Sequence, residues 1–290
     1  SHEELDTIDS KGMKFSLLFD GEDTSINLSI DRTQQKNIPP FAQLTNTIPN
    51  WSAAFGVGAS ALTGGLKLWP IELFANESRQ DVAHINTQTL ETSVVSGQSF
   101  TLTHDLGIGE LKAIWSKRKV DWDDVLDLDG GPFPVAETER HTKYSAETLE
   151  IQLSGSSDSL EYVIGYYKLK DDAYTSNPQS YFGGQSAIAQ NYSGTSDANA
   201  FFGQVTWSVA DKWDLTVGAR KTEEDKTGFK EYVGIFGQNG QGSFDDTSST
   251  FILSHDYSEN TNLYFKLADG FKAGGINAEA PTPFESLKPY

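Results

Sequence analysis

The chain has no cysteine, only one methionine and no long apolar run, and each absence narrows what it can be. Without cysteine there is no disulfide framework and no thiolate metal site. Without a run of about 18 apolar residues there is no transmembrane helix. A membrane β-barrel is still compatible with this composition, because only every second residue of a barrel strand needs to be apolar.

Basic residues are also scarce, since 22 Lys and Arg stand against 41 Asp and Glu, for a formal net charge of -19. A strongly acidic protein is repelled by the phosphates of nucleic acids, so we expect no nucleic-acid partner. By the same reasoning, an anionic membrane surface is an unattractive partner. The length of 290 residues suits one large all-β domain.

Apolar and polar residues alternate through ten short segments, cleanly in most of them. In one segment Val163, Gly165, Tyr167 and Leu169 are expected to share the apolar face, although Ile164 and Tyr166 make the polar face less clear. Phe201, Val205 and Trp207 share one face of such a segment, while Gln204 and Thr206 occupy the other. Successive side chains of a strand point to opposite faces, so each segment predicts a strand with one apolar face. If the protein is a barrel, the following residues should face the membrane: Phe201, Val205, Trp207, Trp213, Leu215, Val217, Leu263 and Phe265.

The gaps between these segments are short and long in turn. The short gaps are 20–25, 105–109, 155–159, 210–212 and 258–262. The long gaps are 33–97, 119–147, 171–198 and 221–248. Outer-membrane barrels have short periplasmic turns and long extracellular loops, so the rhythm favours a barrel. Aromatic residues near the expected strand ends suit the girdles of such a barrel: Phe19, Trp115, Tyr167, Trp207, Trp213 and Tyr257.

A soluble β-sandwich that binds carbohydrate through exposed aromatics is the alternative. A sandwich shows the same alternation, but its apolar face is buried between two sheets. The pattern alone does not say which solvent the apolar face meets, so both interpretations stay open at this point.

Candidate metal and catalytic motifs are weak. An acidic run from Asp121 to Asp129 precedes Gly130, but an EF-hand register would put Val125 and Ala136 at ligand positions. We therefore interpret it as a solvated acidic loop. His104 and His255 each precede an aspartate at a turn, where Asp bonds its own backbone. There is no Gly-x-Ser-x-Gly nucleophile turn. We expect no catalytic residue, no metal site and no cofactor, and hence no enzyme.

The last third of the chain resembles a known family. The stretch from Phe201 to Trp207, followed by Leu215 to Arg220, is similar to a barrel hairpin of TonB-dependent outer-membrane receptors. The segments 111–118, 127–130 and 150–155 resemble other parts of that barrel. More specific is the sequence NLYFKLADGFKAGGIN over 262–277. Its motif residues are Gly270, Phe271, Gly274, Gly275 and Asn277, and we expect the three glycines to let the chain turn sharply.

This resemblance implies an all-β fold, namely a segment of an antiparallel transmembrane β-barrel. Members of the family are similar to 22-stranded barrels with a plugged lumen. We count about ten strands, so residues 1–290 would form an open, partial barrel domain. On this interpretation the plug domain and the C-terminal barrel strands lie outside the sequence.

The resemblance further implies a receptor in the bacterial outer membrane, surrounded by outer-membrane lipid. Such a receptor takes up a scarce nutrient, here expected to be a ferric siderophore, a small-molecule metal chelate. The TonB complex would energise uptake through the plug domain. Aromatics in the long gaps are candidate ligand contacts, with local loop packing as the alternative for each: Trp122, Tyr181, Phe182, Tyr232 and Phe236.

Overall fold

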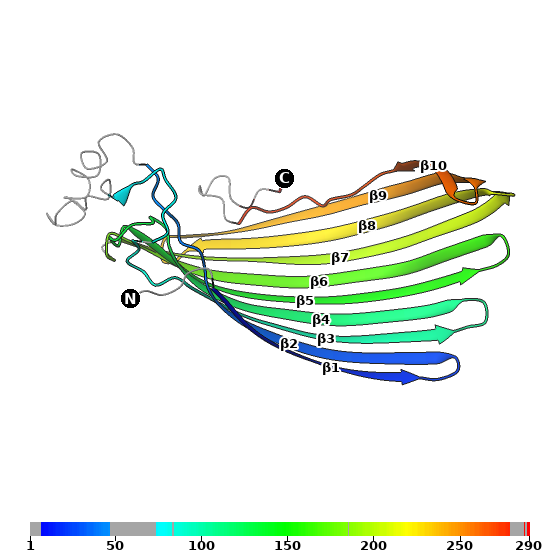
Figure 1. The fold of residues 1–290 in the computed structure, drawn as a ribbon, viewed down its shortest axis with the longest axis horizontal. Helices are drawn as coiled ribbons and strands as arrows, with labels where there is room; N and C mark the ends of the chain where they lie inside the picture. Colours follow the sequence, from blue (N-terminus) through cyan, green and yellow to red (C-terminus); the bar gives the residue numbers. More distant parts are fainter. Residues whose placement is uncertain (1–6, 47–73, 83, 185, 279–286, 288) are drawn as a thin grey trace.

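The structure is a computed structural model that describes residues 7–46, 74–82, 84–184, 186–278, 287 and 289–290. Within these ranges, ten strands form one antiparallel sheet in sequence order (Figure 1). The strands are β1 Thr7–Asp20, β2 Thr24–Ile38, β3 Leu90–Asp105, β4 Glu110–Asp127, β5 Ala136–Ser156, β6 Leu160–Tyr181, β7 Ser186–Ala210, β8 Trp213–Tyr232, β9 Phe236–Ser258 and β10 Thr261–Ala268. None of the described residues lies in a helix long and apolar enough to cross a membrane.

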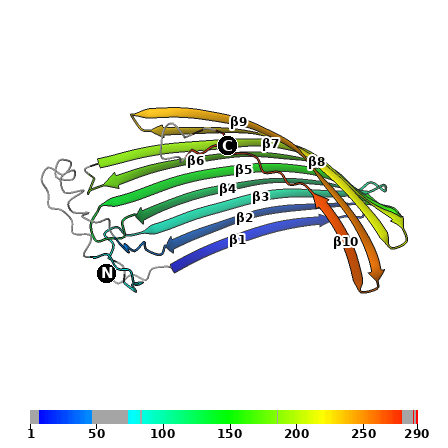
Figure 2. The same cartoon turned by 90° about the horizontal axis from the view of Figure 1, so that it is seen from above.

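The sheet is a single curved layer (Figure 2). No second sheet covers either face within the described residues, so the sandwich alternative is wrong. We call the concave side, on which residues 269–278 lie, the inner face, and the convex side the outer face. Cross-strand partners in register share a face, so the pairings assign every strand residue to one side.

The predicted short turns are confirmed, and backbone hydrogen bonds close them. The N–H of Gly21 donates to the carbonyl of Thr24 at 2.9 Å, and that of Ser157 to Leu160 at 2.7 Å. In the two-residue turn between β7 and β8, Lys212 has φ 65°. All five short turns therefore lie at one end of the sheet.

The predicted long gaps are much shorter than expected, with one exception. β6 continues to Tyr181 and β7 begins at Ser186, so most of the gap 171–198 is strand. Likewise, only residues 233–235 separate β8 from β9. In the halves of these strands that lie away from the short turns, both faces are polar, so the alternation that predicts a strand is missing there. Only the connection from 39 to 89 is long, and its residues 47–73 lie outside the described ranges.

One strand presents the opposite face from the one its sequence indicates. Val163, Gly165, Tyr167 and Leu169 were expected on the apolar face of β6, but they lie on the inner face. Register instead pairs Ile164 with Leu153 and Tyr166 with Ile151, which places both on the outer face. Because both faces of β6 carry apolar residues, alternation could not decide between them. Tyr167 is accordingly not part of an outer aromatic girdle.

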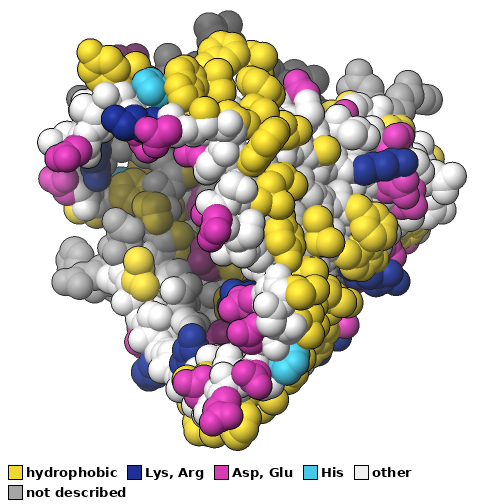
Figure 3. Space-filling view, turned by 90° about the vertical axis from the view of Figure 1, so that its right-hand side faces the viewer, with side chains coloured by type: hydrophobic (Ala, Val, Ile, Leu, Met, Phe, Trp, Pro, Cys, Tyr) yellow, Lys and Arg dark blue, Asp and Glu magenta, His cyan; other side chains and the backbone are white. Residues whose placement is uncertain are grey.

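The eight residues predicted to face a membrane all lie on the outer face. Register pairs Val205 with Val217 and Trp207 with Leu215. Phe201 is 67% exposed and Phe265 is 57% exposed, so this apolar surface is open. From the short-turn end, hydrophobic side chains gather on the side that faces away from the hollow of the sheet (Figure 3).

Candidate ligand-binding face

Trp122 is the predicted contact residue with the most elaborate surroundings. It lies on the inner face of β4, and the guanidinium carbon of Arg140 on β5 is 4.8 Å from the centre of its ring. Arg140 Nε also donates to Asp124 Oδ1 at 3.0 Å. Asp124 is only 3% exposed, so this ion pair is largely removed from solvent on the carboxylate side.

The other four predicted aromatics lie at the far ends of the hairpins. Tyr181 donates its hydroxyl proton to Gln179 Oε1 at 2.8 Å. Phe182 has φ 54° in the turn, and its N–H donates to the carbonyl of Val135. Tyr232 and Phe236 are register partners on the inner face. Four of the five predicted aromatics therefore share the inner face, namely Trp122, Tyr181, Tyr232 and Phe236, while Phe182 lies in a turn.

A cationic side chain that was not among the predicted contacts lies on the inner face, nearer to the short turns than Trp122. The guanidinium carbon of Arg220 is 5.6 Å from the ring centre of Tyr167 and 5.7 Å from that of Phe202. A guanidinium over aromatic faces is attracted by their ring quadrupoles. Alternation along β8 places Arg220 on the polar face, and this was the available signal.

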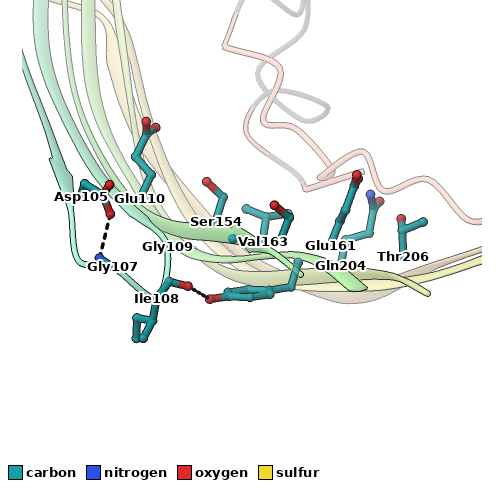
Figure 4. A pocket seen from close by; sticks show the side chains of 13 residues that line it. Asp105, Gly107, Ile108, Gly109, Glu110, Ser154, Glu161, Val163, Gln204 and Thr206 are labelled. Carbon is teal, nitrogen blue, oxygen red and sulfur yellow. Dashed lines mark hydrogen bonds between the residues drawn. The ribbon is translucent and has the colours of Figure 1, made fainter. Parts of the chain in front are cut away.

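An open hollow of about 680 Å³ lies on the inner face near the short-turn end (Figure 4). Glu110, Glu161 and Gln204 line it from β4, β6 and β7. Across the turn below it, Tyr162 donates its hydroxyl proton to the carbonyl of Ile108 at 2.8 Å. The inner face is thus polar at both ends, with acids at the turn end and aromatic–cation pairs toward the other.

The family-motif residues follow β10 and run back over the inner face beside β9. The N–H of Asp269 donates to the carbonyl of Ser249, and its carboxylate accepts from the hydroxyl of Ser249 at 2.7 Å. Gly270, Gly274 and Gly275 were expected to allow a sharp turn, but none of them has a left-handed φ. Added Cβ atoms at Gly274 and Gly275 would instead collide with Phe244 and Tyr290. Nothing in the structure explains Gly270.

This returning segment sits on strand glycines. A Cβ at Gly240 would lie 2.7 Å from Cβ of Leu287, and one at Gly228 would lie 2.8 Å from Cγ2 of Ile276. The two glycines are register partners on β9 and β8, so together they leave a shallow seat. Leu287 is buried there, at 3% exposed.

Replacing Gly240 by valine should therefore dislodge this segment, at an overpacking cost of about 1–3 kcal/mol. We expect faster proteolysis of residues 269–290 in the folded full-length receptor. Gly237→Val is the matched control, because a Cβ there meets nothing closer than 3.7 Å. Equal cleavage of both variants would contradict the seat.

The acidic run is not one solvated loop. Asp121 and Asp123 are exposed on β4, whereas Asp124 and Asp127 are buried. Asp127 and Asp129 accept hydrogen bonds from backbone N–H groups between Asp129 and Ala136, including that of Gly130 at 2.8 Å and that of Ala136 at 2.9 Å. Within the described ranges, no three His, Asp or Glu side chains are placed to hold a metal ion.

Burial raises the pKa of Asp129 to about 6 from its usual 3.8, and the negative charge of Asp127 adds to this rise. A folded-state pKa above the unfolded value means that the folded connection binds more protons between pH 4 and 6. Its stability should therefore fall as the pH rises through that window. Hydrogen exchange of Val135 and Ala136, corrected for intrinsic rates, should be slower at pH 4 than at pH 7. Burial also raises the pKa of Asp127, so Asp129→Asn should weaken this dependence without abolishing it. An unchanged dependence in that variant would contradict the assignment.

Comparison with known proteins fits this geometry. A sequence model of the TonB dependent receptor-like β-barrel matches residues 41–290. The chain belongs to this family. The family consists of transport receptors, and its solved structural neighbours are outer-membrane β-barrel proteins. No curated protein is similar enough in sequence to count as a match.

Solved receptors share the fold at low sequence identity. The ferric yersiniabactin uptake receptor FyuA from Yersinia pestis is 13% identical, with a TM-score of 0.73 over 98% of this chain. The siderophore receptor PiuA from Acinetobacter baumannii is 12% identical, with a TM-score of 0.63 over 97%. The ferric citrate transporter FecA is 11% identical, with a TM-score of 0.62 over 90%. The chain spans 40%, 44% and 36% of their respective lengths.

Proposed function

We propose that this chain is a wall section of an outer-membrane receptor that takes up a ferric chelate. The supporting observation is the division of the sheet into two faces. The eight residues predicted to face the membrane, Val217 among them, make the outer face apolar and open to its surroundings. A sheet surface in contact with lipid needs such an apolar face. The inner face carries paired charges and aromatics, as a hydrated lumen allows.

The cargo is proposed from chemistry and from neighbours. Ferric complexes of small organic chelators present aromatic or anionic surfaces, and Trp122 with Arg140 offers a ring and a cation side by side. Several structurally similar proteins are named as receptors of ferric siderophores or ferric citrate. Energy from the TonB complex, delivered through a plug domain, belongs to the same proposal, as does the pairing of β1 and β10 with further barrel strands.

Uptake of a radiolabelled ferric chelate by cells that express the full-length receptor tests this function. We expect uptake that requires TonB, and a loss of chelate affinity of about tenfold or more in Trp122→Ala. Trp122→Phe keeps an aromatic face and should lose less. Uptake that persists without TonB, or full affinity in Trp122→Ala, would contradict the proposal.

A further inference from the structure

Basic side chains form a row along the outer face, directly beyond the apolar surface on the side away from the short turns. On each strand, followed away from the short turns, the row residue is the first outward-facing polar residue after the run of apolar ones, as with Arg32 after Ile30 and Lys117 after Trp115. From β1 to β9 these residues are Lys11, Arg32, Gln98, Lys117, Glu147, Lys168, Asn199, Lys221 and Ser249. We call these nine positions the basic row.

The basic row runs against the charge of the whole chain. It holds five cations and one acid, whereas the chain carries a net charge of -19. At the next outward positions, Lys119 on β4 and Lys170 on β6 are accompanied by Asp9 on β1, Asp197 on β7 and Glu223 on β8. At the short-turn end, the outward strand positions of the described residues beyond the apolar surface hold no Lys or Arg. The cations therefore mark one edge of the apolar surface, the edge opposite the short turns.

The acids near the row neutralise only part of it. Lys117 pairs with Glu147 at 3.3 Å, and Lys221 pairs with Glu223 at 3.0 Å. One outward position farther from the short turns than the row, Lys170 pairs with Asp197 at 3.1 Å. No ion pair to a described residue involves Lys168, Arg32 or Lys11. The row thus retains cations that can receive an anion from outside the protein.

An apolar hollow of about 570 Å³ opens on the outer face, directly beside this row on its short-turn side. Ile151, Ile164, Phe201 and Gly203 line it, and Lys221 stands at its edge. Lys221 is the register partner of Phe201 on the neighbouring strand. An apolar hollow with a cation at one edge is complementary to a lipid, because the hollow can hold an acyl chain and the cation can hold the anionic headgroup.

We propose that the basic row binds the phosphate groups of outer-leaflet lipids, and that the hollow at Gly203 receives an acyl chain of a lipid whose headgroup lies at Lys168 and Lys221. This inference rests on the proposed outer-membrane function. It differs from the expectation that so acidic a chain avoids anionic membrane surfaces, because it rests on where the cations lie and not on the net charge.

Native mass spectrometry of the full-length receptor tests this inference, with a bisphosphorylated glucosamine lipid and its dephosphorylated form as probes. We expect the phosphorylated form to bind at least about tenfold more tightly, and Lys168→Gln/Lys221→Gln to remove that preference. The control is Lys14→Gln/Lys112→Gln, on the inner face, which should retain it. Gly203→Leu fills the hollow, since a Cβ there meets Ile164 Cγ2 at an ordinary 3.4 Å, and should weaken both lipids.

Heat-modifiable gel mobility after reconstitution into bilayers shows separately whether each protein inserts. A receptor that does not insert would contradict the proposed function. An inserted receptor that binds both lipid forms equally, or loses phosphate preference equally in the control variant, would overturn this inference alone. Displacement of the lipid by millimolar inorganic phosphate would mean an adventitious ion only, and would also overturn it.

Discussion

Replacing Val217 by arginine is expected to make folding into the membrane less favourable by about 2–4 kcal/mol. Val217 lies on the outer face of β8, is 51% exposed and is flanked in register by Val205 and Phe251. An arginine there would place a charge among hydrocarbon tails, where no described side chain of the outer face offers a carboxylate at the same register. Urea titration of the full-length receptor folded into bilayers measures this loss.

Thr250→Arg is the matched control for that substitution. Thr250 lies on the inner face of β9, opposite Gly218, at a similar depth along the sheet. A charge on a hydrated lumen wall should cost little. Equal losses in the two variants would mean that both faces meet the same environment, which contradicts the assignment of faces.

Replacing Arg140 by methionine is expected to destabilise the ends of β4 and β5 that lie away from the short turns by about 2–3 kcal/mol. This loss is smaller than the loss expected for a fully buried ion pair, because the arginine is partly exposed. The substitution leaves the carboxylate of Asp124 buried without its bidentate partner. The aromatic face of Trp122 also loses the cation above it. Urea unfolding of the full-length receptor, together with hydrogen exchange over residues 120–142, measures the effect and locates it.

A double-mutant cycle distinguishes a lost ion pair from lost packing. Asp124→Asn combined with Arg140→Met removes the uncompensated charge and should recover about half or more of the loss. A double variant as unstable as Arg140→Met alone would show that the arginine acts through packing on Trp122. Intact stability in the single variant would contradict any structural role for the pair.

Sequence reasoning succeeded where one face of a strand meets a different environment from the other. In β7 and β8 the alternation of Trp207 with Thr206, and of Val217 with Thr216, predicted both the strands and their apolar face. The two-residue turn at Asp211 and Lys212 followed from where that alternation stopped. Each of these signals arises from period two, which a half-apolar strand must show.

It failed where both faces meet similar surroundings. Beyond Lys221 in β8, residues such as Thr222, Glu223 and Asp225 are polar on both sides, so the strand looked like a loop although it continues to Tyr232. In β6, apolar residues on both sides left the face undecided between Tyr166 and Tyr167. Alternation measures a contrast between faces, and it carries no information where there is none.

The candidate site depended on contacts that no local pattern records. Trp122 was found because it is aromatic and outside the predicted strands, but Arg140 joins it only through the register of β4 with β5. The seat of Leu287 on Gly240 likewise follows from tertiary packing. The basic row was hidden by the net charge, because a sum over the chain cannot show on which face Lys168 and Lys221 lie.

The claim on which the account depends is that the outer face meets lipid and the inner face meets water. Because this chain has no cysteine, single cysteines introduced into it can carry nitroxide labels at chosen positions of the sheet. Electron paramagnetic resonance in bilayers would then compare Val205→Cys with Gln204→Cys, neighbours on opposite faces of β7. We predict that the label at 205 is accessible to oxygen, and the label at 204 to a water-soluble nickel complex. Nickel access at 205, or the reverse pattern, would contradict the account.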